Sequence, residues 1–495
     1  MQELLSDIDE IRGRYDIPAV AFTLVSPDGP TQTRVLGLAN RDGSIPATPD
    51  TLFRIGSITK TFTALAILQA QDRGLLRLDH QITEMAPDAP LDNPWRGTRP
   101  VHLVHLLEHT AGLLDLSRAE FDHNTPLSIS EGLRVAPAQR VVRWPPGMHS
   151  SYSNAGYGLA GYVLEKATGI SWPRIMQDWL FLPLGMNSAS ATAVTPDRGT
   201  LAAGYDTDGQ TPIPYWHMVM PSFGAINASP REMGALPRLF LNDGRVDGRT
   251  VVSKAAIRRM ERPTTTLAAR SGLRYGYGPG LSAFPYRGFL FYGHGGDGDG
   301  YLSRFGYSRQ LDRGYFVVIN AFHHRALREI RERVQDYLIV GVQPPAAPPE
   351  PDVDVDSLKN LAGRYESVTW RFPWQSGGNL PEIMAVLVEG DGLYLHYDGE
   401  KRKLVPVSHR HFRHVGESTA TMAFVRWGGA LYFQGEEGNF RRIEPPRSRK
   451  TCSPPRQPDS RGLGMRRSRL AGGRRMESTR QIRFRSPRSS GCGNR

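Results

Sequence analysis

The chain has 495 residues, which exceeds the usual length of a single compact domain. Its hydrophobic content of 39% is compatible with a folded enzyme. It contains no apolar run of the about 18 residues that a membrane-spanning helix needs. The formal net charge of +12 comes from the last segment, because residues 446–495 hold 15 Lys and Arg against 2 Asp and Glu, whereas the rest holds 46 against 47. Residues 1–445 are therefore nearly neutral, which excludes a general electrostatic attraction of this part to nucleic acid. Both cysteines, Cys452 and Cys492, lie after residue 445, which excludes a disulfide framework in residues 1–445.

The N-terminal part of the chain predicts two strands and a long helix. Residues 1–15 are charged and amphipathic and lack the basic start and apolar core of a signal peptide, so we expect none, and a cytoplasmic location by default. Residues 19–25 predict a buried strand, and a turn at residues 27–29 leads to a returning strand at residues 33–37. A helix follows near residue 57, with these apolar residues on its buried side: Ile58, Phe62, Leu65, Ala66 and Leu68.

Strands and a closing helix return late in the first two thirds of the chain. Residues 289–291 and 315–319 predict strands, and the helix that follows has apolar residues at helical spacing: Leu327, Ile330, Val334 and Leu338. Because strands stand at both ends with helices between them, we expect an α/β (α+β) domain. Its antiparallel sheet would be built from both ends of the domain and flanked by helices, beside a mostly helical lobe.

Changes in composition divide the chain into four parts. Residues 1–340 form the predicted α/β domain, and residues 341–352 are a proline-rich linker. Residues 353–445 have alternating strand patterns between glycine turns and predict a small antiparallel β-domain. Residues 446–495 are rich in Arg, Ser, Gly and Pro and cannot bury enough apolar surface to fold, so we expect a disordered basic tail. We expect this tail to be solvated without a required role; weak binding to nucleic acid or anionic lipid is the alternative.

The most informative motif is Ser57-Ile58-Thr59-Lys60. Residues at positions i and i+3 lie on one helix face, so the Ser57 hydroxyl and the Lys60 amine can meet. A serine is a poor nucleophile until a neighbouring base takes its proton, and an unprotonated lysine can do so. The spacing alone is weak, because both residue types are common. The motif gains weight because two further motifs follow it along the chain, first Tyr152-Ser153-Asn154 and then His294-Gly295-Gly296.

These motifs resemble the serine β-lactamase and penicillin-binding-protein superfamily, and most closely its branch of esterases, D-aminopeptidases and DD-peptidase-like hydrolases with S-x-x-K, Y-x-N and H-x-G. The resemblance covers roughly residues 17–340 and includes the flanking segments Phe53-Arg54-Ile55-Gly56, Trp144-Pro145-Pro146-Gly147 and Pro183-Leu184-Gly185-Met186. It implies a serine hydrolase that works through an acyl-enzyme, without cofactor or metal. Residues 353–445 resemble the lipocalin-like barrel appended to some members. Relatives are often exported, which leaves the location of this protein open.

The resemblance implies a role for each motif residue. Ser57 is the nucleophile, and its backbone N–H at a helix N-terminus is half of an oxyanion hole; the second donor is the N–H of Asp297. Lys60 must be neutral to accept a proton, and Tyr152 would shuttle protons between Ser57, Lys60 and the leaving group. Whether Lys60 or Tyr152 is the formal base stays open. Asn154 would hydrogen-bond Lys60 or the substrate carbonyl.

His294 stands where β-lactamases and many penicillin-binding proteins have the lysine of K-T-G. A histidine is mostly neutral at pH 7, so affinity for carboxylates should fall and ester or amide substrates become more plausible. Gly295 and Gly296 would let substrate backbone pass close to the strand. We therefore expect an esterase or peptidase-like hydrolase of small or peptide-like acyl substrates. The alternatives are a β-lactamase or DD-carboxypeptidase, and a catalytically silent binding or scaffold protein on the same fold; oligomeric state stays open.

Two other patterns could bind metal but are weaker. His102, His105 and His109 lie at i, i+3 and i+7 and could line one helix, yet no H-E-x-x-H pattern is present. Residues 297–300 (Asp-Gly-Asp-Gly) look like a fragment of a calcium loop without its third ligand and terminal glutamate. We expect no metal at either place.

Overall fold

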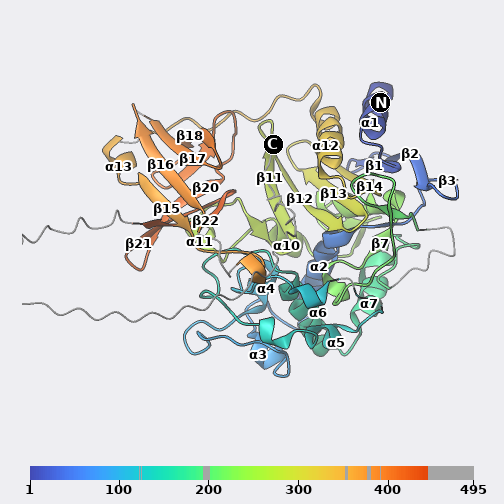
Figure 1. The fold of residues 1–495 in the computed structure, drawn as a ribbon, viewed down its shortest axis with the longest axis horizontal. Coiled ribbons are helices and arrows are strands. Elements are labelled where there is room, and N and C mark those ends of the chain that lie inside the picture. Colours follow the sequence, from blue (N-terminus) through green and yellow to red (C-terminus); the bar gives the residue numbers. More distant parts are fainter. Residues whose placement is uncertain are drawn as a thin grey trace, which may run out of the picture. The chain divides into compact units, whose positions relative to one another are not determined.

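The computed structural model of the protein describes residues 1–121, 123, 125–192, 201–351, 355–375, 381–390 and 392–443 (Figure 1). The predicted basic tail lies outside these residues. Among the helices of the described part, none combines the length and the apolarity needed to cross a membrane.

The larger part of the fold is built around one antiparallel sheet of eight strands, in the order β10-β11-β12-β13-β14-β1-β2-β3. The first strand of the chain pairs with a late one, with Val20 opposite Ile319, so the two ends of the domain meet in the centre of the sheet, as predicted. The strands are β1 (Ala19–Val25), β2 (Gln32–Asn40), β3 (Ile45–Pro46), β10 (Tyr277–Gly278), β11 (Leu281–Tyr286), β12 (Phe289–Gly298), β13 (Tyr301–Ser308) and β14 (Arg313–Ile319).

Helices cover both faces of this sheet. On one face, α1 (Gln2–Arg14) and α12 (His324–Ile339) pack together and against the apolar side chains of β1 and β14 (Figure 1). On the other face lies a larger core around α2 (Thr59–Asp72) and α6 (Asn154–Thr168). Every residue of β1 is buried, because both of its faces are covered, and six of its seven residues are apolar; the exception, Thr23, donates its hydroxyl to the carbonyl oxygen of Pro230 at 2.6 Å.

The α2 helix is enclosed on all sides, with every residue from Thr59 to Ala70 buried. The sequence predicted one buried side, and this expectation was too narrow. The polar residues on the remaining sides are satisfied by backbone carbonyls: Thr61 Oγ1 donates to Gly280 O at 2.7 Å, and Thr63 Oγ1 donates to Ser222 O at 2.7 Å. Threonine hydroxyls therefore allow the helix to be buried without unpaired polar groups at these positions.

The larger part of the fold also contains short helices and pairs of short strands. The helices are α3 (Ile82–Met85), α4 (Leu103–Leu107), α5 (Ile129–Leu133), α7 (Trp172–Ile175), α8 (Pro230–Met233), α9 (Ala235–Leu241), α10 (Lys254–Met260) and α11 (Leu267–Arg270). The pairs are β4 (Phe53–Arg54) with β7 (Asn227–Ala228), β5 (Gly204–Tyr205) with β6 (Pro212–Ile213), and β8 (Arg245–Val246) with β9 (Arg249–Thr250).

The later part of the described chain is a closed antiparallel barrel, preceded by α13 (Val355–Lys359). Its strands are β15 (Gly363–Ser367), β16 (Ile383–Glu389), β17 (Gly392–Tyr397), β18 (Glu400–Pro406), β19 (His411–His414), β20 (Met422–Trp427), β21 (Ala430–Gly435) and β22 (Gly438–Ile443). The barrel closes where Arg364 of β15 pairs with Ile443 of β22. Its own apolar cluster includes Tyr365, Phe412 and Phe433. The predicted antiparallel β-domain is confirmed as a barrel.

The barrel packs on the larger part through α11, which contacts β20 and β21. Gln434 of β21 is buried at this junction. Its Oε1 accepts the Ala268 N–H at 2.8 Å, and its Nε2 donates to Met148 O at 2.9 Å. One amide side chain thus satisfies backbone groups from two separate segments.

Candidate active site

Ser57 and Lys60 lie in contact at the start of α2. Ser57 belongs to a 3₁₀ turn, Gly56–Ile58, that follows β4, and Lys60 is in the first turn of α2. Lys60 Nζ lies 2.9 Å from Ser57 Oγ and 2.8 Å from the carbonyl oxygen of Phe223. The lysine is fully buried, and both of these partners are uncharged. A buried amine with neutral partners is poorly suited to hold a positive charge.

The environment of Lys60 shifts its pKa downward. Burial is the largest cause and holds the pKa of Lys60 well below its ordinary value. The positive charge of Arg371 acts in the same direction, whereas the carboxylates of Asp115 and Asp297 oppose it. Because burial dominates, the neutral amine is favoured, and a neutral amine can accept the proton of the Ser57 hydroxyl.

Tyr152 lies beside this pair. Lys60 Nζ is 4.9 Å from the centre of the Tyr152 ring. Burial raises the pKa of the Tyr152 phenol, while Arg371 and a hydrogen bond with Ser57 act in the opposite direction, so the phenol stays protonated at neutral pH. The residue after it, Ser153, caps α6 by accepting the Gly156 N–H at 3.1 Å. The cap fixes the backbone that carries Tyr152.

The turn that carries Ser57 is pressed against β12. A Cβ added to Gly296 would lie 1.8 Å from the carbonyl oxygen of Ile55, and a Cβ added to Gly56 would lie 2.9 Å from the Asp297 nitrogen. Gly56 also has a φ of +52°, which other residues adopt with strain. The close approach puts the Asp297 backbone nitrogen next to the residue that precedes Ser57.

His294 is buried and neutral. Its Nε2 lies 2.6 Å from the hydroxyl of Tyr277, and its Nδ1 hydrogen-bonds the carbonyl of Gly295. A carbonyl can only accept, so Nδ1 carries the proton and Nε2 accepts from Tyr277. Burial is the main cause that lowers the pKa of His294 to about 3. The side chain therefore offers no cation at this position.

Asn154 is held by a carboxylate that the sequence analysis did not assign. Asp115 is buried, and its Oδ1 accepts the backbone N–H groups of Asn154 at 2.8 Å and Leu116 at 2.9 Å. Asn154 Nδ2 lies 3.2 Å from Asp115 Oδ2. Among the described residues, no hydrogen bond joins Asn154 to Lys60, and Asn154 Oδ1 is buried without a partner. Asn154 thus contacts Asp115 rather than Lys60.

Arg371 reaches this site from the barrel, between β15 and β16. Its Nε donates to Asp115 Oδ2 at 2.8 Å, and its carbonyl accepts the Asp115 N–H at 2.8 Å. Its guanidinium carbon lies 4.6 Å from the centre of the Tyr152 ring, a cation–π distance. Sequence reasoning missed Arg371 because no local pattern marks it, and its approach depends on how the barrel packs.

The three histidines do not share a helix face. His102 is the N-cap of α4, His105 lies within it, and His109 lies beyond its end with a φ of +56°. The pattern at i, i+3 and i+7 therefore does not correspond to one helix, and among the described residues these histidines form no group with metal-binding spacing. His109 instead packs on Tyr152, with ring centres 4.2 Å apart, and its Nδ1 accepts the Ser153 N–H at 3.1 Å. The segment His109-Thr110-Ala111-Gly112-Leu113, which also resembles the hydrolase superfamily, could have pointed to His109.

A family model described as Beta-lactamase matches residues 4–338 of this chain. The chain belongs to the beta-lactamase family. It is 28% identical over 377 residues to penicillin-binding protein 4 of Amycolatopsis lactamdurans, an alignment that covers 72% of this chain and 95% of that relative. It is 33% identical over 180 residues to esterase EstB of Burkholderia gladioli, which covers 33% of this chain and 45% of the esterase.

A solved structure extends the fold similarity beyond the beta-lactamase-family region. The octameric penicillin-binding protein homologue from Pyrococcus abyssi aligns with a TM-score of 0.57 at 23% identity, over 89% of this chain and 99% of that chain. At this identity the match supports the fold alone. In this beta-lactamase-family protein, a serine hydroxyl, a buried amine and a phenol meet at one place, which is an arrangement suited to proton transfer at a nucleophile.

Proposed function

We propose that this beta-lactamase-family serine hydrolase cleaves ester or peptide-like amide bonds through an acyl-enzyme formed on Ser57. The observation that carries the proposal is the fully buried Lys60 amine, 2.9 Å from Ser57 Oγ. A lysine buried among neutral partners favours its uncharged form, and the uncharged form is the base that a serine nucleophile needs. The chemistry would belong to residues 1–340, and the barrel in residues 353–445 would add Arg371.

The pKa directions favour Lys60 as the base and Tyr152 as a proton donor. The pKa of Lys60 is lowered by burial and the pKa of Tyr152 is raised by burial, so the stable pair is a neutral amine beside a protonated phenol. In acylation, Lys60 takes the Ser57 proton as Oγ attacks the carbonyl carbon. Tyr152 then passes a proton to the leaving group and regains one from Lys60. In deacylation, water attacks the acyl-enzyme, and the same groups transfer protons in the reverse order.

The oxyanion of each tetrahedral intermediate would be held by the N–H groups of Ser57 and Asp297. Support comes from the contact of the Gly56–Ile58 turn with β12, which brings the Asp297 nitrogen close to Gly56. Losing one such donor typically costs about 3 kcal/mol of transition-state stabilisation.

Neutral esters and amides are favoured over β-lactams by the uncharged His294. Arg371 changes this argument in part, because it brings a cation to Tyr152 from another segment. The names of the relatives include both a penicillin-binding protein and an esterase. β-Lactamase or DD-carboxypeptidase activity is therefore kept as the competing proposal within enzymes.

Labelling with a fluorophosphonate probe tests the nucleophile. We expect one label per chain, found on Ser57 by peptide mass spectrometry, and no label on Ser57→Ala. Ser6→Ala, at an exposed position of α1, is the control and should be labelled like the wild type. A Ser57→Ala protein that is still labelled would overturn the assignment, and a wild-type protein that is never labelled or acylated would favour the scaffold alternative.

Substrate class is tested by comparing short p-nitrophenyl esters, D-amino acid amides and nitrocefin on the same preparation. We expect hydrolysis of the esters or amides, with the acyl group detected on Ser57 by intact-protein mass spectrometry. Fast nitrocefin turnover without ester or amide cleavage would reverse the ranking in favour of a β-lactamase.

A further inference from the structure

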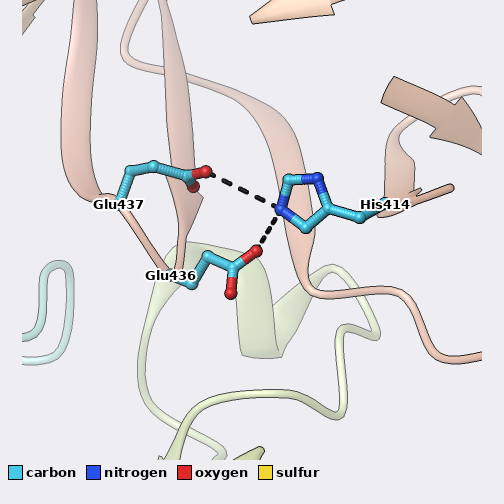
Figure 2. Close-up of side chains that lie close together, drawn as sticks. All are labelled: His414, Glu436 and Glu437. Atoms are coloured by element: carbon cyan, nitrogen blue, oxygen red, sulfur yellow. Dashed lines mark hydrogen bonds and ion pairs between the residues drawn. The ribbon is translucent and has the colours of Figure 1, made fainter. Parts of the chain in front are cut away.

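A cluster of metal-ligating side chains lies in the barrel, on residues that the hydrolase chemistry does not use. Glu436 and Glu437 form the two-residue turn between paired Gly435 of β21 and Gly438 of β22, and His414 is the last residue of β19 (Figure 2). His414 Nε2 hydrogen-bonds Glu436 and lies 3.9 Å from Glu437 Oε1. One ligand atom of each of the three residues lies within 4.8 Å of the others.

Further charged side chains surround this cluster. The carboxylate of Glu417 interacts electrostatically with Glu436 and His414 and adds a third negative group. Arg402 lies 3.3 Å from Glu437 Oε1, but it also pairs with Glu400 at 2.7 Å. The guanidinium that pairs with Glu437 is therefore shared with Glu400.

Buried oxygen atoms in the cluster also lack partners. The Glu437 side chain is only 3% exposed, and its Oε2 has no hydrogen-bond partner among the described residues. The same holds for Glu417 Oε2. Leaving a buried carboxylate oxygen unpaired costs free energy, and a bound cation removes this cost. In Figure 2 the carboxylate groups of Glu436 and Glu437 both point toward the His414 ring.

We propose that His414, Glu436 and Glu437 bind one divalent cation. An imidazole nitrogen with two carboxylates suits the borderline ions Zn²⁺ and Co²⁺, and also the harder Mn²⁺, better than Mg²⁺, which prefers oxygen ligands and retains its waters. Zinc binds such atoms at about 2.0–2.2 Å, so ligand atoms within a few ångströms of one another need only small side-chain rotations to meet on one ion. Water would complete the coordination, because three protein ligands leave a position open.

The location suggests a structural role at the junction of the barrel with β11 and β12. Four residues after His414, Ser418 Oγ donates to the carbonyl oxygen of Gly288, in the turn between β11 and β12, at 2.8 Å. An ion on His414 would restrain the segment that makes this contact. We therefore expect the cation to raise thermal stability. We expect no direct contact between the cation and the groups that carry out the hydrolase chemistry at Ser57.

Isothermal titration calorimetry on the full chain, stripped with a chelator and dialysed, tests the site with ZnCl₂, MnCl₂ and MgCl₂. We expect one Zn²⁺ or Mn²⁺ per chain, at least tenfold weaker binding of Mg²⁺, and a rise in melting temperature of about 3 °C or more at saturating ion. The absorption spectrum of the Co²⁺ form should lack a thiolate-to-metal band. Such a band would place the ion on Cys452 or Cys492 and overturn the proposal, as would the absence of stoichiometric binding.

Matched variants locate the ion. Glu437→Gln and His414→Gln should reduce Zn²⁺ affinity at least tenfold, and Glu437→Gln should be about as stable as the wild type without metal, because it removes one of three neighbouring carboxylates and keeps an acceptor for Arg402. His396→Gln is the control, since His396 lies 3.8 Å from a single carboxylate, Glu389, on the same barrel. If Glu437→Gln does not fold, Glu436→Gln replaces it. Unchanged affinity in a folded cluster variant, or equal loss in His396→Gln, would contradict the assignment.

Discussion

The charge state of Lys60 is set by groups from three separate segments. Burial in α2 favours the neutral amine, Arg371 of the barrel favours it further, and the carboxylates of Asp115 and Asp297 oppose it. In the proposed mechanism, Arg371 does not touch the reacting atoms of Ser57 and acts through Lys60 and Tyr152, so we propose a positioning role for it. A change at Arg371 should alter the pH at which Lys60 loses its proton.

Replacing Arg371 with methionine should move the acid limb of the pH–activity profile. In the proposed mechanism, activity needs the neutral Lys60 amine, so kcat/KM should rise with pH through the pKa of Lys60. Removing the nearby positive charge raises that pKa, and the acid limb should therefore move to higher pH. Below the limb, kcat/KM should fall by several-fold, and it should approach the wild-type value at high pH. The measurement is kcat/KM for one ester across the pH range.

Arg371→Lys is the matched control because it keeps the positive charge. Its acid limb should stay closer to that of the wild type than the limb of Arg371→Met. Arg371→Met should also lose stability, because it leaves the buried Asp115 without its cation; the usual cost of about 3–5 kcal/mol is an upper limit, since Arg371 is partly exposed. Equal profiles for the methionine variant and the wild type would show that Arg371 has no influence on Lys60.

At the scale of elements, the contact between β12 and the Gly56–Ile58 turn sets the geometry of the site. Two adjacent glycines of β12 differ in what surrounds them. A Cβ on Gly296 would lie 1.8 Å from the backbone oxygen of Ile55, whereas a Cβ on Gly295 would meet the end of the Arg304 side chain at 2.8 Å. Backbone cannot move aside without moving Ser57, but an arginine side chain can. Glycine is thus needed at position 296 because the backbone of Ile55 packs closely against it.

Gly296→Ala should therefore be much more damaging than Gly295→Ala. The added methyl group of Gly296→Ala would push β12 away from the turn that carries Ser57 and separate the two proposed oxyanion donors. We expect kcat/KM to fall by about 100-fold or more, the scale for loss of an oxyanion-hole donor. Gly295→Ala should stay within a few-fold of the wild type.

Both variants need a folding check by circular dichroism and thermal melting. A folded Gly296→Ala protein with normal activity would show that β12 and the turn move independently.

Elements whose contacts are local in sequence could be predicted, and those that depend on distant packing could not. The helical spacing of the apolar residues in α12 predicted its buried face correctly, and the i, i+3 spacing of Ser57 and Lys60 predicted the meeting of two atoms that lie 2.9 Å apart. The full enclosure of α2 was missed because its threonines look solvent-facing in the sequence. Arg371 was missed because only the packing of the barrel brings it to Asp115.

At the scale of the whole described chain, Gln434 is a point where the barrel and the larger part share hydrogen bonds. It is 3% exposed and serves Ala268, Met148 and, through Nε2 at 2.9 Å, His149 Nδ1. Without it, at least two buried backbone groups lose a partner. Because the barrel also carries Arg371, weaker packing at this junction should reach the active site.

Gln434→Ala should lower the free energy of unfolding by about 2–4 kcal/mol, from unpaired buried groups and lost packing. It should also move the acid limb of activity in the same direction as Arg371→Met. Urea unfolding and the pH profile measure the two effects. Lys401→Gln, at a partly exposed position of β18, is the control and should change stability by no more than about 0.5 kcal/mol. A destabilised Gln434→Ala protein with an unchanged pH–activity profile would show that the packing of the barrel does not influence catalysis.

The complete enclosure of α2 restricts how this protein can acquire new specificities. A helix with neighbours on every side cannot tilt or slide to suit another acyl group without opening cavities around it. Directed evolution for a different substrate should therefore accumulate replacements in the surrounding loops and in the segment near Arg371, while the residues from Thr59 to Ala70 tolerate almost none.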